Sequence, residues 1–300
     1  MPSDAHAADL RRRKPIRQQL KPYLFLLPIL TFAVGFVYYP FFKTFLYAFS
    51  QVNFKGEIVG FAGTDNFSYL FSRRDFKIAL ENTLRLMLIN VPATVALTLG
   101  MALLVWKRRH LSAVNETLFS VPIAVSMASA GLVFKVLLNP TVGYFNYALG
   151  LNIGWYTDKN TAMYGILMLT VWMGLGFNFL LFLSALRSIP SGILEAATLD
   201  GAGPLSRFFR VQLPLIVPTL FYVACTNMVQ AMMTSGPVII LTQGTSSLRA
   251  TTTLIYMMYS SGYSSANYGL AACVSLVTFF LTLTFTVLGF WLEGKRGSYQ

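Results

Sequence analysis

Charged side chains are scarce in this sequence, and their scarcity excludes a water-exposed surface over most of the chain. Asp, Glu, Lys and Arg make up 11% of the 300 residues, whereas soluble domains carry roughly 25%. Hydrophobic residues reach 55% and come in runs of roughly 20, the length that crosses a hydrocarbon core about 30 Å thick. The sequence therefore predicts that a lipid bilayer surrounds most of the chain.

Cysteine and histidine are scarce too, which argues against metal and redox chemistry. Cys225 and Cys273 each lie in an apolar run without Cys or His at metal-ligand spacing, so we expect them to be small packing residues. His6 lies in a polar N-terminal tail and His110 in a basic turn, which leaves no imidazole cluster. We expect no metal site.

Six apolar segments are long enough to span a membrane: residues 22–42, 84–106, 118–138, 162–183, 215–233 and 268–291. They lack the alternation of barrel strands, and in lipid only helices and closed barrels satisfy their own backbone hydrogen bonds. We predict an all-α membrane protein of about six transmembrane helices. Its membrane domain covers residues 22–291, between a basic tail over 1–21 and a short tail over 292–300.

The distribution of Lys and Arg predicts that both termini are cytoplasmic. In that orientation the inside segments hold 14 of these residues and the outside segments hold eight. The turn Lys107-Arg108-Arg109 is the firmest anchor, because short loops obey the positive-inside rule best. The same bias accounts for the net charge of +12, so no nucleic-acid partner is needed.

The segment between the fourth and fifth spans, residues 187–214, is longer than a minimal turn and predicts two short helices. Ser191 fits an N-cap with Glu195 in the early turns, and Gly201 fits the end of the first helix. Ala196 and Ala197 are small helix formers beside an acid. Such a helix surface can be approached closely by another protein.

This segment resembles the loop signature of permease subunits of binding-protein-dependent ATP-binding-cassette importers. The signature is Glu-Ala-Ala, three residues, Gly, nine residues, Ile, one residue and Leu-Pro. The same spacing occurs here, with Val in place of Ile, in Glu195-Ala196-Ala197, Gly201, Val211 and Leu213-Pro214. Residues typical of the carbohydrate-uptake branch, which includes maltose, multiple-sugar and glycerol-phosphate permeases, extend the resemblance over nearly the whole chain: Ser188-Ile189-Pro190, Leu199-Asp200-Gly201-Ala202, Leu27-Pro28, Tyr39-Pro40, Asn66-Phe67 and Glu81-Asn82-Thr83.

The resemblance implies a type I importer permease in a bacterial plasma membrane, with a coupling helix that docks on an ATP-hydrolysing subunit. It implies that Glu195 is the acid of the docking surface, Ala196 and Ala197 its close-contact face, and Gly201 the turn that sets the helix angle. Asp200, Leu213 and Pro214 complete the coupling set. The implied partners are a second, homologous permease in a heterodimer, an ATPase dimer, an extracytoplasmic solute-binding protein and a sugar or sugar-like solute.

A phosphate-binding loop is not apparent in this chain. Gly289 and Gly294-Lys295 have the spacing of such a loop, but Arg296 replaces the hydroxyl residue that would hold magnesium, and the stretch ends an apolar span. The Ser, Thr, Asp and His residues form no triad-like grouping that would indicate a catalytic site. We therefore expect a non-catalytic subunit without a cofactor of its own, with ATP and magnesium used by a separate ATPase.

Polar residues inside the spans predict the solute pathway, because such residues tend to face a bundle interior or a water-filled cavity. Asn227 and Gln230 lie three apart on one face of a helix, with Thr234 a turn further. Amide groups and an aromatic face suit a sugar, so the candidates are Gly174, Phe177, Asn178, Asn227, Gln230 and Thr234. The alternative for each is hydrogen bonding that only holds the spans together.

Two other classes of function fit the sequence less well. A proton-coupled secondary transporter would need ionisable groups in its spans, and these are nearly free of Asp, Glu and His; no clear internal repeat is present either. An integral membrane scaffold or enzyme would show activity in the purified chain alone.

Overall fold

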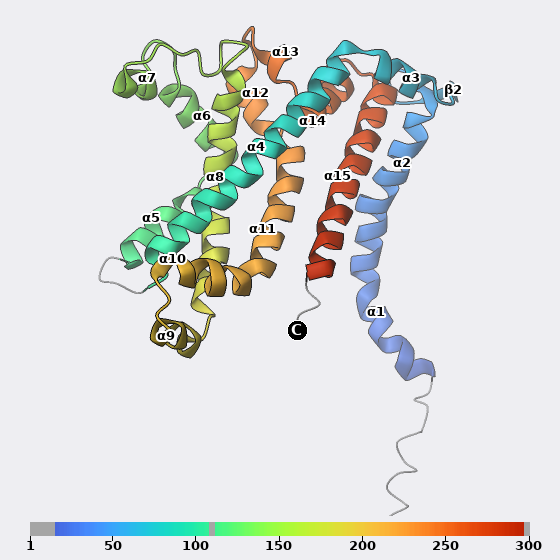
Figure 1. The fold of residues 1–300 in the computed structure, drawn as a ribbon. Coiled ribbons are helices and arrows are strands. Elements are labelled where there is room, and N and C mark those ends of the chain that lie inside the picture. Colours follow the sequence, from blue (N-terminus) through green and yellow to red (C-terminus); the bar gives the residue numbers. More distant parts are fainter. Residues whose placement is uncertain (1–15, 108–111, 297–300) are drawn as a thin grey trace, which may run out of the picture.

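The fold is a bundle of long helices, seen in a computed structural model that describes residues 16–107 and 112–296 (Figure 1). Predicted features at Arg11 to Lys14, at Arg108 and Arg109, and at both histidines lie outside the described residues. The elements in chain order are α1 (Ile16–Ala33), η2 (Val34–Tyr38), α2 (Tyr39–Ala48), β1 (Ser50–Val52), β2 (Ile58–Phe61), α3 (Asp65–Ser72), α4 (Arg74–Val105), α5 (Ser112–Ala124), α6 (Met127–Leu137), α7 (Tyr144–Leu149), α8 (Ala162–Arg187), α9 (Ser191–Leu199), α10 (Pro204–Arg207), η3 (Phe208–Gln212), α11 (Leu213–Met232), α12 (Gly236–Thr242), α13 (Leu248–Thr251), α14 (Leu254–Tyr259), η4 (Ser260–Ser264) and α15 (Tyr268–Arg296).

Among the described residues, five helical stretches are long and apolar enough to cross a membrane: Phe25–Ala48, Arg74–Val105, Ala162–Arg187, Pro204–Met232 and Tyr268–Trp291. They correspond to five of the six predicted spans, although the second begins ten residues earlier than the sequence suggested. The all-α membrane fold is confirmed for the described residues, with one two-stranded antiparallel hairpin in which Ser50 lies opposite Phe61.

The predicted span over 118–138 is wrong as a continuous helix. The chain forms α5 and α6 there, and the two helices meet at a bend of 104°. Ser126 has an extended backbone, with ψ 150°, and its hydroxyl accepts a hydrogen bond from the backbone N–H of Ser129 at 3.2 Å. Ser126 therefore begins a new helix as its N-cap, which apolar composition alone does not reveal.

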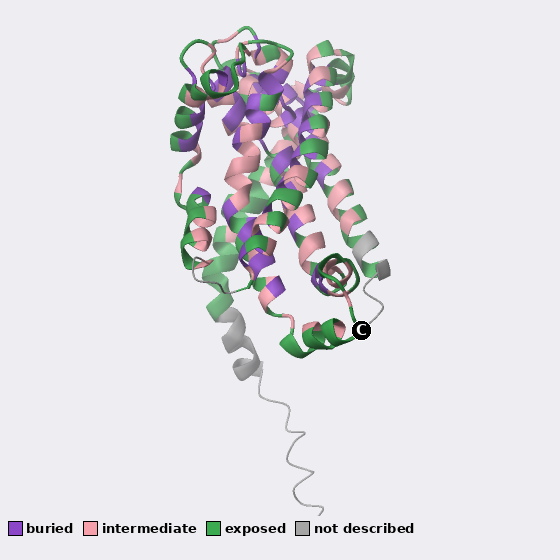
Figure 2. Ribbon diagram, turned by 60° about the vertical axis from the view of Figure 1, so that its left-hand side comes forward, coloured by how far each residue is buried: buried purple, intermediate pink, exposed green. Residues whose placement is uncertain are grey.

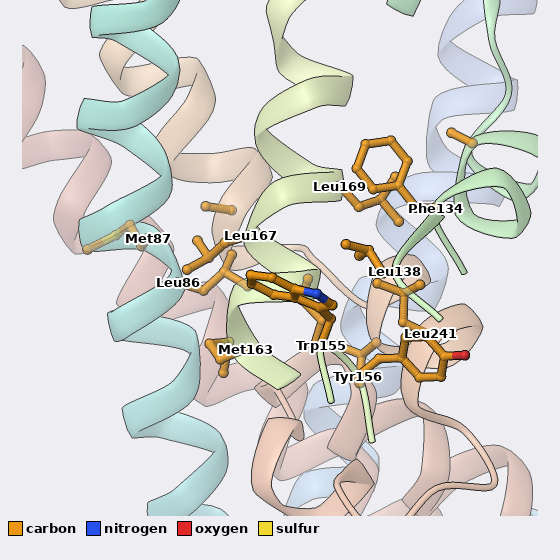
Figure 3. Close-up of a cluster of buried hydrophobic side chains, with 14 of the residues drawn as sticks. Leu86, Met87, Phe134, Leu138, Trp155, Tyr156, Met163, Leu167, Leu169 and Leu241 are labelled. Carbon is orange, nitrogen blue, oxygen red and sulfur yellow. The ribbon is translucent and has the colours of Figure 1, made fainter. Parts of the chain in front are cut away.

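The core lies where α4, α8 and α11 pack together, with α6 and α12 beside α8. Figure 2 shows the buried residues gathered inside the bundle and toward the end away from the C-terminus. Figure 3 shows Trp155 in the middle of one buried apolar cluster, between Leu86 of α4 and Leu138 at the end of α6. The indole N–H of Trp155 donates to Asn146 Oδ1 at 2.8 Å, which ties α7 to this core.

The first span differs from the others because none of its most apolar stretch is buried. It joins the bundle through α2, which packs against α15. The start of α1, the end of α15 and the helix α9 lie at one end of the bundle, and α7, α13 and β2 lie at the other (Figure 1). The two ends of the described chain are therefore on the same side.

Candidate functional site

The segment over 187–214 folds into α9, α10 and η3 at one tip of the bundle. The prediction of Ser191 as N-cap is wrong. The helix already includes Ser191, and Pro190 occupies the capping position with ψ 132° and no side-chain cap. Proline suits that position because its fixed φ, here −57°, is compatible with the extended backbone before a helix.

Gly201 ends α9 in a left-handed turn with φ +80°. The N–H of Gly201 donates to the carbonyl of Thr198 at 3.1 Å, and the N–H of Ala202 donates to the carbonyl of Ala197 at 3.0 Å. These two bonds are those of a Schellman motif, which favours glycine at this position. The chain then enters α10, where an Arg207 guanidinium N–H donates to Thr198 Oγ1 at 3.0 Å.

The surface of α9 is open, since none of its residues is buried. Leu199 is 90% exposed although it is apolar, and Glu195, Ala196 and Asp200 are exposed on the same helix and its end. Ala197 is half-buried. An exposed apolar side chain among small and acidic residues is typical of a protein-docking surface.

Leu213 and Pro214 do not belong to that open surface. They form the first turn of α11, where proline is favoured, and Leu213 packs against the buried cluster that contains Phe182 and Ile216. Their structural place is the start of the fifth crossing helix. The predicted coupling set is therefore divided between the exposed α9 and the base of α11.

Arg187 anchors the base of this segment, a role that sequence reasoning missed. Its guanidinium binds both carboxylate oxygens of Glu116 on α5, at 2.5 and 3.1 Å. It also donates to the carbonyls of Val105 and Trp106 at the end of α4, each at 3.3 Å. One side chain thus ties α4, α5 and α8 together four residues before α9 begins. The only available signal was a lone acid, Glu116, in an acid-poor region of the sequence.

Asn178 and Asn227 form a buried polar contact between α8 and α11. Asn178 Nδ2 donates to Asn227 Oδ1 at 3.0 Å and to the carbonyl of Gly174 at 2.8 Å, while Asn227 Nδ2 donates to the carbonyl of Val223 at 2.7 Å. A Cβ at Gly174 would lie 3.4 Å from Asn227 Oδ1 and 3.1 Å from a methyl of Thr94, so glycine leaves room there for α11 and α4 beside α8. Three of the predicted pathway residues therefore meet in the core.

The other predicted pathway residues lie elsewhere. Phe177 is 53% exposed and Gln230 is also exposed. Asn227 is buried although Gln230 is only three residues away on the same helix. Asn227 lies on the side of α11 that packs against α8, and Gln230 lies on the side that is open. Thr234 is buried, and its carbonyl accepts a hydrogen bond from Thr253 Oγ1 at 2.7 Å.

The open side of α11 carries a polar stripe, which we define as Thr219, Tyr222, Thr226 and Gln230. Their spacing of three or four residues places them on one helical face. Tyr222, Thr226 and Gln230 line a groove of about 410 Å³ between α11 and α15, with Thr286 and Phe290 on the opposite wall. Thr226 Oγ1 donates to the carbonyls of Tyr222 and Val223 in its own helix. The exposed amide of Gln230 is therefore the group that indicates a water-filled or protein-covered face rather than lipid.

Within residues 16–107 and 112–296, no three His, Cys, Asp or Glu side chains are placed to hold a metal ion. Gly289 and Gly294 lie inside the continuous helix α15, whereas a phosphate-binding loop requires a strand that leads through a loop into a helix.

Comparison with known proteins identifies the relatives of this chain. The family described as "Binding-protein-dependent transport system inner membrane component" matches residues 77–296. The chain is 33% identical to the sn-glycerol-3-phosphate transport system permease protein UgpA of Yersinia enterocolitica, over 93% of this chain and 96% of that protein. It is 34% identical to the UgpA protein of Escherichia coli O6:K15:H31, over 94% of this chain and 97% of that protein.

Solved structures share the fold. A chain of a bacterial ABC transporter that imports the acidic polysaccharide alginate matches with a TM-score of 0.80 and 22% identity, over 94% of this chain and 99% of that one. A chain of a bacterial alginate ABC transporter, solved in complex with an alginate pentasaccharide-bound periplasmic protein, matches with a TM-score of 0.78 and 23% identity, over 93% and 96%.

Proposed function

The chain belongs to the family of binding-protein-dependent transport system inner membrane components, and we propose from this that it is the permease subunit of an ATP-driven importer for a sugar or sugar phosphate. A membrane location follows from the family and from the five apolar helices. The observation that carries the proposal is the exposed helix α9, which ends in the Schellman turn at Gly201. An exposed surface lets another protein bind α9, and the hydrogen-bonded turn at Gly201 fixes how α9 joins the rest of the chain. A helix that transmits a movement from one protein to another needs both features.

We propose that α9 is the surface on which a separate ATPase dimer docks. Glu195, Ala196 and Asp200 are exposed there for contact, and Leu199 supplies an apolar anchor. The Arg187–Glu116 pair would pass a displacement of α9 to α4, α5 and α8 as one body. ATP and magnesium are then used by the partner, and this chain acts as a non-catalytic subunit.

This arrangement requires the α9 end of the bundle to face the cytoplasm. The positive-inside distribution supports that orientation, because Arg187, Arg207 and Arg210 all lie in the segment around α9. The opposite end, with α7, α13 and the hairpin, would then receive an extracytoplasmic solute-binding protein. The name of the alginate transporter complex, which includes a periplasmic protein, agrees with such a partner.

The solute would pass along the polar stripe of α11. Hydroxyl, amide and phenol groups bind sugar hydroxyls, and the groove they line is open on one side for a second, homologous permease to close. The UgpA relatives are named for sn-glycerol-3-phosphate, so the substrate class proposed is a sugar or a polyol phosphate. Asn178 and Asn227 bind each other and would hold the spans around this path.

Reconstitution tests the coupling role. The complete transporter, with its ATPase and binding protein, would be placed in liposomes, and solute-stimulated ATP hydrolysis and uptake of glycerol phosphate and of neutral sugars would be measured. Glu195→Arg reverses a charge on the docking face, so both readouts should fall by about tenfold or more, which corresponds to about 1.4 kcal/mol or more.

Glu81→Arg is the matched control, because Glu81 is an exposed acid near the opposite end of the bundle. Its ATP hydrolysis should stay coupled to uptake. Full stimulated hydrolysis and uptake in Glu195→Arg would refute the docking role of α9.

A further inference from the structure

A mixed polar and apolar pocket lies at the α9 end of the bundle, between the end of α4 and the segment α10–η3. Its volume is about 530 Å³, and Leu104, Trp106, Lys107, Arg207, Phe209 and Gln212 are among the residues that line it. It is separate from the groove on α11 and from the exposed face of α9. No step of the proposed transport cycle uses it.

The polar side chains of the pocket are hydrogen-bond donors that suit an anion. Lys107 is exposed and Arg207 is half-buried, and Gln212 is only 4% exposed. Gln212 Nε2 has no hydrogen-bond partner among the described residues, and a buried amide without a partner is costly. The described residues that line the pocket include no Asp or Glu, so its polar part is cationic.

Three apolar side chains that line the pocket are exposed. Leu104 and Leu205 are each 74% exposed, and Phe209 is 59% exposed. The ammonium of Lys107 lies 5.4 Å from the centre of the Trp106 ring, and Trp and Lys together are typical of the level of the lipid headgroups. A free phosphate ion would leave this apolar surface uncovered, whereas acyl chains would cover it.

We propose that this pocket binds an anionic phospholipid, with its phosphate at Lys107, Arg207 and Gln212 and its acyl chains along Leu104, Leu205 and Phe209. Basic pockets between transmembrane helices on the cytoplasmic side bind such headgroups through charge and hydrogen bonds. Arg207 also donates to Thr198 of α9, so the bound lipid lies one side chain away from the coupling helix.

Native mass spectrometry of the complete transporter tests this site. The complex would be released from mixed micelles that contain phosphatidylglycerol or phosphatidylcholine with identical acyl chains, and the retained lipids would be counted. Phosphatidylglycerol should be retained preferentially. Lys107→Gln should lower its apparent affinity about fivefold, because one basic contact near a membrane surface contributes about 1 kcal/mol.

Arg210→Gln is the matched control, because Arg210 is an exposed arginine of η3 that does not line the pocket. It should keep the affinity of the unaltered protein, as should Lys107→Arg. Equal retention of the two lipids, or an unchanged affinity in Lys107→Gln, would overturn the proposal. Displacement of the lipid by millimolar inorganic phosphate would overturn it too, in favour of a free-phosphate site.

Discussion

At the scale of single residues, two side-chain amides, one buried and one half-buried, join segments that are separated in the chain. Asn82 Nδ2 donates to the carbonyls of Ala250 and Thr252 at 2.8 and 2.9 Å. Asn66 Nδ2 donates to the carbonyls of Ala48 and Ser50 at 3.1 and 3.0 Å. Irregular backbone within or beside a membrane needs such partners, because no bulk water is available in the hydrocarbon region to satisfy it.

Asn227 and Gln230 were predicted together as residues of the solute pathway, but Asn227 is buried and Gln230 is exposed. Asn227→Leu removes the acceptor for Asn178, so the permease should lose about 1 kcal/mol of stability, the usual size of an interhelical hydrogen bond in membranes. Its unfolding temperature in detergent should fall. Gln230→Leu removes an exposed group from the groove, so it should leave that temperature unchanged and lower uptake about fivefold.

Both variants replace an amide by the same apolar side chain on the same helix, so each is the control for the other. A lower unfolding temperature in Gln230→Leu together with a stable Asn227→Leu would contradict the assignment of the two sides of α11.

At the scale of elements, the residues at the helix ends decide where each helix begins and stops, which average hydropathy does not show. The break between α5 and α6 follows from the N-cap at Ser126, and the exit from α9 follows from the left-handed residue at Gly201. An apolar run therefore predicts that a segment is embedded, but local backbone hydrogen bonds decide whether it is one helix or two.

Gly201→Ala tests the turn after α9. Open space surrounds the position, so the cost is the left-handed backbone alone, about 1–2 kcal/mol. We expect the turn to shift and the uptake per ATP hydrolysed to fall in the reconstituted transporter.

Gly192→Ala is the corresponding control within α9. That glycine also has open space around it and lacks a left-handed backbone, so alanine should be neutral or slightly stabilising. If the two variants transport equally well, the angle between α9 and α10 does not matter for coupling.

At the scale of the whole molecule, the proposed function depends on which end of the bundle faces the cytoplasm. Single cysteines can report this after Cys225 and Cys273 are replaced by alanine. Asp200→Cys lies at the end of α9 and Lys159→Cys lies in the loop before α8, and both positions are exposed. A membrane-impermeant maleimide added to intact cells that lack the partner ATPase should label Lys159→Cys and should label Asp200→Cys only after permeabilisation.

Labelling of Asp200→Cys in intact cells would place α9 outside the cell, where no ATPase could reach it. The proposal of an ATP-driven importer would then fail for this orientation of the chain.

The amino-acid sequence by itself determined that a lipid bilayer surrounds most of the chain, that the fold is helical and where five of the spans lie. It also determined the family resemblance. Runs of apolar residues and a fixed motif spacing are local properties, so they can be recognised without the structure. Only the tertiary structure decided that Asn178 binds Asn227, that Gln230 faces outward, that Arg187 ties three helices together and that Leu213 is packed in a core. Each of these depends on the rotation of one helix against another. Such rotation is set by packing between residues distant in the chain, which the pattern along a single span does not specify.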